Sequence, residues 1–283
     1  CGYAQVTMKP GVAYATSGPG ATNLITGIAN AYFDSIPCIF ITGQVNTFEG
    51  KKGFEVRQKG FQETDIVSMV EPVTKAAFYI KEPDDIPGKL EEAYTIAIKG
   101  RPGPVLLDIP MNVQRAEIST NQKGGKVTVR PSDADRAIEA LNTINKWLKQ
   151  SKRPLILAGA GVAQSGMTNA FRKMIEQLQV PVVTSMLGRD LLPADSCFEY
   201  GFIGAYGHRA ANVMVSKCDL LITMGSRIDC RQTGATLADF AEHAKILRID
   251  IDAGEMTNNI HEDEIDLHVD LKQLIPLMDG LKI

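Results

Sequence analysis

The residues with the clearest chemical potential form a glycine-rich corner, Gly18-Pro19-Gly20. A short apolar run, residues 11–15, precedes this corner, and an amphipathic run, residues 24–33, follows it. A strand that turns into a helix at such a corner leaves backbone N–H groups unpaired at the start of the helix, where they can bind a polar ligand. The alternative is an ordinary tight turn, because glycine and proline are common turn residues. The motifs that accompany the corner favour a ligand site.

A second corner, Gly159-Ala160-Gly161, follows the apolar run 154–158. It lacks the third glycine and the distal acidic residue of the dinucleotide fingerprint, so by itself it is a weak indication of a nucleotide site. The four histidines and five cysteines form no group with the spacing typical of metal ligands, and no metal site is expected among them.

Several motifs, in one order along nearly the whole chain, resemble the large-subunit acetolactate synthases and their thiamine-diphosphate-dependent relatives. The matching segments are SGPGATN (17–23), IPCIFITGQV (36–45), GFQETDIV (60–67), GRPGPVLLDIP (100–110), GSRIDCRQTG (225–234) and ILRIDIDAGEM (246–256). The resemblance implies a carboligase that decarboxylates pyruvate and transfers the two-carbon unit to a 2-oxoacid. It also implies thiamine diphosphate, Mg²⁺ and a structural FAD as cofactors, and a homodimer or homotetramer as the assembly.

The resemblance assigns roles to residues of the first half of the chain. Pro19 and Asn23 would contact the pyrimidine ring of thiamine diphosphate, and Gly18 and Gly20 would let the backbone approach that ring. Phe61 and Gln62 would project toward the reacting end of the cofactor as the catalytic pair. A neutral amide there can donate to a substrate carbonyl or a developing alkoxide. The alternative for Gln62 is a surface amide in a loop.

In the second half, the resemblance implies FAD contacts at positions that offer glycine corners, hydroxyls, arginines and carboxylates. Arginine can pair with a diphosphate, and a carboxylate can accept hydrogen bonds from ribose hydroxyls. Solvated or ion-paired surface positions are the alternative for the arginines. The implied flavin contacts are Gly159, Gly161, Thr184, Met186, Gly225, Ser226, Arg227, Asp229, Arg231, Asp250 and Asp252, with Arg101 reaching the flavin from the first half.

Two functional motifs of the family have no counterpart in the sequence. The glutamate that activates the aminopyrimidine would precede Cys1, and there is no Gly-Asp-Gly of the magnesium- and diphosphate-binding motif. Asn258-Asn259 is best interpreted as a surface turn. The Mg²⁺ ligands are therefore expected on a C-terminal domain outside this chain, and this chain alone is expected to be inactive.

The motifs must be positioned by alternating strands and helices. Short Val/Ile/Leu-rich runs at 11–15, 37–42, 104–109, 154–158, 180–184, 219–224 and 246–251 are typical of parallel strands buried on both faces, and the periodic segments 84–98, 133–149 and 168–178 predict helices. We expect two doubly wound α/β domains with mostly parallel sheets. These are a partial thiamine-diphosphate pyrimidine-binding domain over 1–115, a linker over 116–130, and a Rossmann-like central domain over 131–283.

Composition excludes several other classes of protein. The net charge of −3 gives no basic stripe for nucleic acid, and no apolar run reaches the ~18 residues that a membrane helix needs. An odd number of cysteines without a disulfide pattern indicates a reducing compartment, which we expect to be the cytoplasm. Cys38 lies within an apolar run and is expected to be a small core residue.

Two departures from the family pattern leave the acceptor substrate open. Met111 stands where typical acetolactate synthases have lysine, and the loop that contains the basic segment 51–59 is several residues longer. Both resemble relatives of cell-surface sugar pathways, which transfer the two-carbon unit to a keto-sugar nucleotide, although a solvated loop is the plainer interpretation. An alternative of another class is a non-catalytic interaction module that retains the fold.

Overall fold

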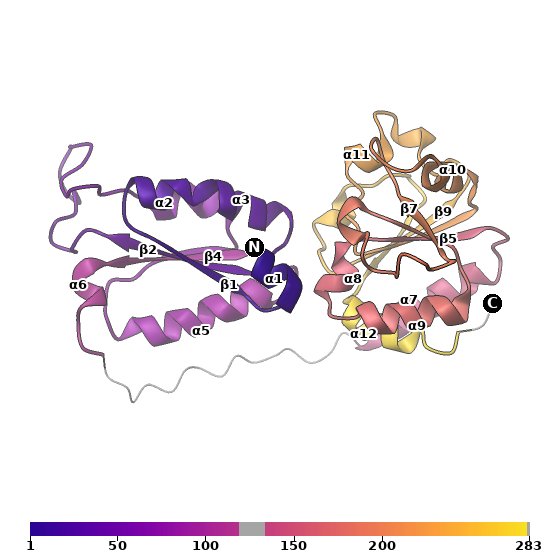
Figure 1. Ribbon diagram of the computed structural model, residues 1–283, viewed down its shortest axis with the longest axis horizontal. Helices are drawn as coiled ribbons and strands as arrows, with labels where there is room; N and C mark the ends of the chain where they lie inside the picture. Colours follow the sequence, from indigo (N-terminus) through magenta and orange to yellow (C-terminus); the bar gives the residue numbers. More distant parts are fainter. Residues whose placement is uncertain (119–133, 282–283) are drawn as a thin grey trace. The chain divides into compact units, whose positions relative to one another are not determined.

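The computed structural model describes residues 1–118 and 134–281, and the chain divides into two compact units, Cys1–Val129 and Arg130–Ile283 (Figure 1). Most of the expected linker at 116–130 and the expected helix start near 131–133 lie outside the described residues. Each unit is built on its own parallel sheet, as the sequence predicted.

The first unit contains a four-stranded sheet in the order β1-β2-β4-β3. The strands are β1 (Gly11–Ala15), β2 (Cys38–Gln44), β3 (Ala76–Tyr79) and β4 (Pro104–Pro110). The helices are α1 (Gly2–Thr7), α2 (Pro19–Asn23), α3 (Ile25–Phe33), α4 (Ile66–Val70), α5 (Asp85–Ile98) and α6 (Met111–Gln114), with the 3₁₀ turn η1 (Glu71–Val73). All seven residues of β4 are buried, because helices cover both faces of this central strand.

Two apolar clusters lie on opposite faces of this sheet. Residues of α3 and α4 pack with Cys38 and Phe40 on one face. Residues of α5 pack with Ile39 and Leu107 on the other. Figure 1 shows α2 and α3 on one side of the strands and α5 on the opposite side. This arrangement is doubly wound, and the expected core position of Cys38 is confirmed.

The second unit contains a six-stranded sheet in the order β10-β9-β8-β5-β6-β7. Its strands are β5 (Pro154–Ala158), β6 (Val182–Thr184), β7 (Glu199–Phe202), β8 (Leu220–Met224), β9 (Lys245–Asp250) and β10 (Ile265–His268). Its helices are α7 (Ala134–Leu148), α8 (Ala160–Gln164), α9 (Thr168–Leu178), α10 (Arg209–Lys217), α11 (Cys230–Thr233) and α12 (Leu271–Leu277), with 3₁₀ turns η2 (Met186–Gly188), η3 (Leu237–Asp239) and η4 (Glu255–Thr257).

Helices α7, α9 and α12 cover one face of the second sheet, and α10 covers the other. From the central strand β5 the chain runs through β6 to β7 in one direction, then returns to β8 and continues through β9 to β10 in the other. This order is that of the dinucleotide-binding Rossmann fold. The expected Rossmann-like topology is confirmed.

The sequence predicted most of the strands but not all of them. All seven apolar runs expected to be strands form strands, with ends shifted by at most two residues, but β3, β7 and β10 were not predicted. Each of these three strands lies at an edge of its sheet, where burial is partial and no continuous apolar run is needed. Within the described part of the chain, no helix combines the length and apolar character needed to cross a membrane.

Candidate functional site

The predicted strand-to-helix corner lies at the end of β1. Gly18 precedes α2 with φ +61° and ψ −124°, a conformation that side-chain-bearing residues rarely adopt, and Pro19 is the first helical residue. The corner is closed by another part of the chain, because a Cβ on Gly18 would lie 2.7 Å from Cβ of Gln62. Gln62 itself has φ +61°, which is unusual for a residue other than glycine. The two residues that the sequence singled out therefore contact each other through a tight backbone approach.

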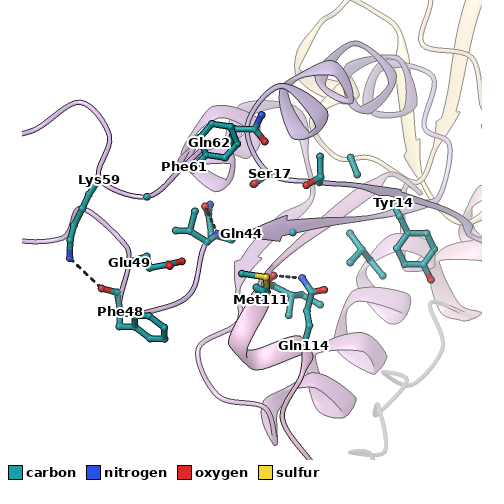
Figure 2. Close-up of a pocket in the computed structure, with 17 residues that line it drawn as sticks. Tyr14, Ser17, Gln44, Phe48, Glu49, Lys59, Phe61, Gln62, Met111 and Gln114 are labelled. Carbon is teal, nitrogen blue, oxygen red and sulfur yellow. Dashed lines mark hydrogen bonds between the residues drawn. The ribbon is translucent and has the colours of Figure 1, made fainter.

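An open pocket of about 1000 Å³ lies beside this contact (Figure 2). Its floor is formed where β1, β2 and β4 end, and the loop from Val45 to Gln62 forms one side. After β2 the chain continues into α4, which packs on one face of the sheet, and after β4 it continues into α6, whose Val113 packs on the other face. The carboxyl ends of β2 and β4 thus form a topological switch point, where open α/β sheets bind ligands.

The pocket combines apolar walls with neutral amides. Ile41, Val45 and Ile109 are among the aliphatic residues, and Gln44, Gln62 and Gln114 bring amides. In Figure 2, Phe61 and Gln62 lie above Gln44, and Met111 and Gln114 lie below it. Such a surface can hold a flat polar heterocycle through a few directed hydrogen bonds.

Gln44 is fixed by a buried network beneath the pocket. Its Nε2 donates to Oδ2 of Asp108 at 3.0 Å and to the carbonyl of Thr64 at 2.6 Å, and its Oε1 accepts from N of Val45 at 3.0 Å. Thr42 Oγ1 donates to the other oxygen of Asp108 at 2.7 Å. Burial raises the pKa of Asp108 to about 6, although the bonds from Thr42 and Gln44 act in the opposite direction. The network ties two strand ends to the segment that follows Gln62.

The pocket gathers some of the residues expected from the sequence and not others. Phe61, Gln62 and Met111 line it, and Phe61 is 84% exposed. The lining residues do not include Gly18, Pro19, Gly20 or Asn23, whose expected contacts with a pyrimidine ring remain predictions. Gly20 allows a close approach of Thr16 Cγ2, since a Cβ on Gly20 would lie 2.7 Å from that methyl carbon.

Arg101 lies away from this pocket. It precedes β4, at the amino end of the sheet, and its Nε donates to Oγ of Ser35 at 2.8 Å. The pocket occupies the carboxyl end of the same sheet. The expected contact of Arg101 with a flavin stays a prediction, separate from the pocket.

The expected glycine positions of the second unit meet at the switch point of its sheet, between β5 and β8. Gly161 N donates to the carbonyl of Gly225 at 3.0 Å, and a Cβ on Gly161 would lie 2.7 Å from Cα of Gly225. Gly225 has φ +57°. A Cβ on Gly159 would overlap the same carbonyl. These three glycines thus have a packing role of their own, because no side chain fits where the segments that follow β5 and β8 pack against each other.

Polar groups surround these three glycines at the carboxyl ends of the strands. Thr184 ends β6, and its Oγ1 is buried without a hydrogen-bond partner within residues 1–118 and 134–281. Ser226 Oγ donates to Oε1 of Gln232 at 3.1 Å, and the exposed Met186 begins η2.

The predicted charged residues beyond β8 and β9 are held by short local bonds. Arg227 pairs with Asp229 at 3.3 Å, and Asp229 caps α11 by accepting from N of Arg231 at 2.8 Å. Asp250 Oδ1 accepts from N of Asp252 at 3.0 Å. The sequence-predicted flavin residues of this unit therefore cluster around the ends of β5, β6, β8 and β9.

Sequence reasoning missed several residues that line the first pocket or lie in the network beneath it. Gln44, Asp108 and Thr42 were quoted within motifs but given no role, and Tyr14 and Gln114 were not considered. A polar side chain inside an otherwise apolar strand was the available signal for the first three, because such groups are buried only when they are hydrogen-bonded. Neither Tyr14 nor Gln114 carries a comparable signal.

Comparison with known proteins places both units in one family. The N-terminal thiamine pyrophosphate binding domain matches residues 1–69, and the central domain of thiamine pyrophosphate enzymes matches residues 141–278. Similar relatives include a probable acetolactate synthase large subunit from Methanocaldococcus jannaschii (40% identical, 93% of this chain, 44% of the relative), the acetolactate synthase large subunit of Lactococcus lactis (39%, 99% and 46%) and the isozyme 2 large subunit of Escherichia coli (37%, 98% and 48%). The chain spans just under half the length of these relatives. By its two domains and their order, it belongs to the thiamine pyrophosphate enzymes.

Proposed function

We propose that this chain carries the pyrimidine-binding and central portions of a carboligase of the acetolactate synthase type. The reaction decarboxylates a 2-oxoacid such as pyruvate and joins the two-carbon unit to a second 2-oxoacid. The observation that carries the proposal is the switch-point pocket, which places Gln62 at the carboxyl ends of β2 and β4 in the unit that contains the matched binding domain.

The residues of the pocket fit the pyrimidine half of thiamine diphosphate. A flat ring with polar nitrogens requires apolar walls and a few fixed hydrogen-bonding groups. Ile41, Val45 and Ile109 supply the walls, and the network under Gln44 fixes one amide. When bound, the cofactor supplies carbanion stabilisation.

The protein's part is to position groups and to exclude water. The tight contact with Gly18 fixes the backbone of Gln62, so that its amide can donate to negative charge developing on the substrate oxygen. The apolar walls would lower the local dielectric around a bound ligand and so strengthen that hydrogen bond. A donor that needs no reorganisation when charge develops lowers the barrier.

FAD, Mg²⁺ and the assembly complete the proposal. FAD would bind at the β5/β8 switch point, where the buried hydroxyl of Thr184 lacks a partner within the described residues and Arg227 is half-exposed. Mg²⁺ would hold the diphosphate through oxygen ligands. Within the described ranges, no group of three or more His, Cys, Asp or Glu residues is arranged to hold a metal. We further propose a homodimer or homotetramer in the cytoplasm.

Flavin binding is tested by colour and by titration. The purified full-length protein should be yellow, and Arg227→Ala should weaken FAD retention by roughly 1–3 kcal/mol, the scale of a charged hydrogen bond. Arg153→Ala is the matched control, because Arg153 lies at the amino end of β5 and donates to the carbonyl of Lys217. Protein that takes up no FAD on titration would reject the flavin assignment.

The reaction is tested with the full-length protein, thiamine diphosphate, Mg²⁺ and pyruvate. We expect release of CO₂ and accumulation of 2-acetolactate. Gln62→Ala should raise the activation barrier of carboligation by about 3 kcal/mol and so slow the reaction roughly a hundredfold, which is the effect of losing one oxyanion donor. Gln5→Ala, at an exposed position of α1, should behave as wild type. Failure to release CO₂ from any 2-oxoacid would reject the enzyme class and favour a non-catalytic module.

A second acceptor is favoured by two lining residues of the pocket. Met111 and Lys59 both line it, and Lys59 belongs to the basic segment 51–59. An apolar wall with a nearby cation would suit a keto-sugar nucleotide better than a small 2-oxoacid, because the diphosphate needs a positive partner. In that case acetolactate should form slowly, and a keto-sugar nucleotide should accelerate turnover.

A further inference from the structure

The loop between Val45 and Gln62 forms one wall of the pocket, yet much of it is exposed. Residues 51–59 are all exposed, and four of them are basic: Lys51, Lys52, Arg57 and Lys59. An exposed loop of this length needs specific bonds to keep one conformation, because ordering each residue costs conformational entropy.

One carboxylate supplies those bonds. Glu63 Oε1 accepts from N of Lys51 at 2.7 Å, and Glu63 Oε2 accepts from N of Lys59 at 3.0 Å and from N of Gly60 at 3.2 Å. The donors come from the outgoing and the returning ends of the loop, so a single side chain closes residues 51–60 into a ring. The Gln58 side-chain amide adds a bond to the Glu63 carbonyl at 3.0 Å.

The carboxylate is ionised in the folded protein. Burial raises its pKa, but the three backbone N–H groups and the charge of Lys51 outweigh that effect, so the pKa of Glu63 is lower than its ordinary value. Hydrogen bonds to an ionised acceptor are stronger than those to a neutral one.

The same ring fixes the turn that contains Gln62. Glu63 N donates to the carbonyl of Gly60 at 3.1 Å. Gly60 packs against Val45, since a Cβ on Gly60 would lie 2.9–3.0 Å from the side-chain carbons of that residue. On the other side of the turn, Gln62 packs closely against Gly18, and both residues have a positive φ. The turn thus packs between Val45 and Gly18, and the hydrogen bonds of the Glu63 carboxylate stabilise it.

We propose that Glu63 is a positioning residue, which holds the basic loop closed beside the pocket and thereby keeps the Gln62 amide aimed at the reacting atoms. The catalytic part of this inference rests on the proposed function, whereas the closed loop does not. Removing the charge of Glu63 should release the loop first and misplace Gln62 as a consequence.

Limited trypsin digestion of the full-length protein reads the loop directly, without cofactor or activity. Glu63→Gln keeps the shape of the side chain but turns an NH₂ group toward backbone donors. We expect cleavage after Lys51, Lys52, Arg57 and Lys59 to become at least tenfold faster, with the sites identified by mass spectrometry. Glu55→Gln is the matched control, because Glu55 is an exposed glutamate of the same loop and loses the same charge.

Kinetics then separate positioning from simple stability. Glu63→Gln should lower kcat about tenfold with little change in KM for the 2-oxoacid, and Glu63→Asp, which keeps the charge on a shorter side chain, should recover part of the rate.

Two results would overturn the inference. Wild-type cleavage rates in Glu63→Gln would refute the closed loop, and fast cleavage with wild-type kcat would refute the coupling to Gln62. If Glu63→Gln fails to fold, Glu63→Asp decides the same two questions. Wild-type protein that releases no CO₂ refutes the proposed function and with it the coupling to catalysis, while the digestion still decides whether Glu63 closes the loop.

Discussion

The contact between Gly18 and Gln62 predicts a specific response to Gly18→Ala. An alanine at φ +61° and ψ −124° occupies a strained conformation, which costs about 1–3 kcal/mol. Its methyl group would also lie 2.7 Å from Cβ of Gln62 and 3.0 Å from the Gln62 carbonyl oxygen. One of these neighbours is backbone, so the clash cannot be relieved by a side-chain rotation alone, and overpacking of this kind costs a further 1–3 kcal/mol or so.

We therefore expect Gly18→Ala to destabilise the first unit by about 3 kcal/mol and to lower its Tm by roughly 10 °C, as measured by calorimetry. Relief of the clash must move Gln62, so kcat for carboligation should fall at least tenfold in the full-length enzyme. Gly27→Ala is the matched control, because a Cβ at this helical position meets nothing within 4 Å and should stabilise α3 slightly. An unchanged Tm would refute the strain, and a lower Tm with wild-type kcat would refute the link to Gln62.

Three further predictions concern stability. Because the pKa of Asp108 is raised from 3.8 to about 6, this group contributes up to about 3 kcal/mol of stability that is gained as the pH falls through 6 toward 4. In urea denaturation, the stability of wild type relative to Asp108→Asn should therefore rise as the pH falls across that range, and a constant difference would contradict it. Gly159→Ala should destabilise the second unit by about 3 kcal/mol, because its Cβ would overlap the carbonyl of Gly225. A wild-type Tm would refute this prediction, because it would mean that the segments after β5 and β8 can move apart without cost. Arg248→Met should cost about 3–5 kcal/mol in chemical denaturation, because it removes the cation that pairs with the buried Glu264 side chain at 2.9 Å. The double variant Arg248→Met with Glu264→Gln should recover part of the loss, and a neutral single variant would refute the argument.

The strands that the sequence predicted are those with continuous apolar runs. All residues of β4 and β8 are buried, so nearly every position had to be apolar. The strands β3, β7 and β10 have mixed burial because each has a neighbour on one side only. The residues of β3 show no alternation of apolar and polar types. β10 does alternate them, as Ile265, Asp266, Leu267 and His268, and this short pattern was an available signal.

The candidate site was predictable in its motifs but not in its contacts. Gly18 and Gln62 are more than forty positions apart in the sequence, and nothing local to either shows that they touch. Gln62 could be recognised only through the resemblance, because an isolated glutamine in a polar loop gives no sign of a positive φ. The hydrogen-bond network under the pocket could not be predicted either, because it depends on the strand register that places Thr42 beside Asp108.

The ring closed by Glu63 also bears on how such a sequence can diverge. Residues 52–58 lie between two points that are tied to the same carboxylate, so insertions there lengthen the ring without moving the Lys51 and Lys59 amides. Doubling the length of a flexible loop costs only about 0.6 kcal/mol in closure entropy. Gains and losses of residues between these anchor points can therefore accumulate over generations and alter what the rim of the pocket admits, while the amide of Gln62 keeps its place.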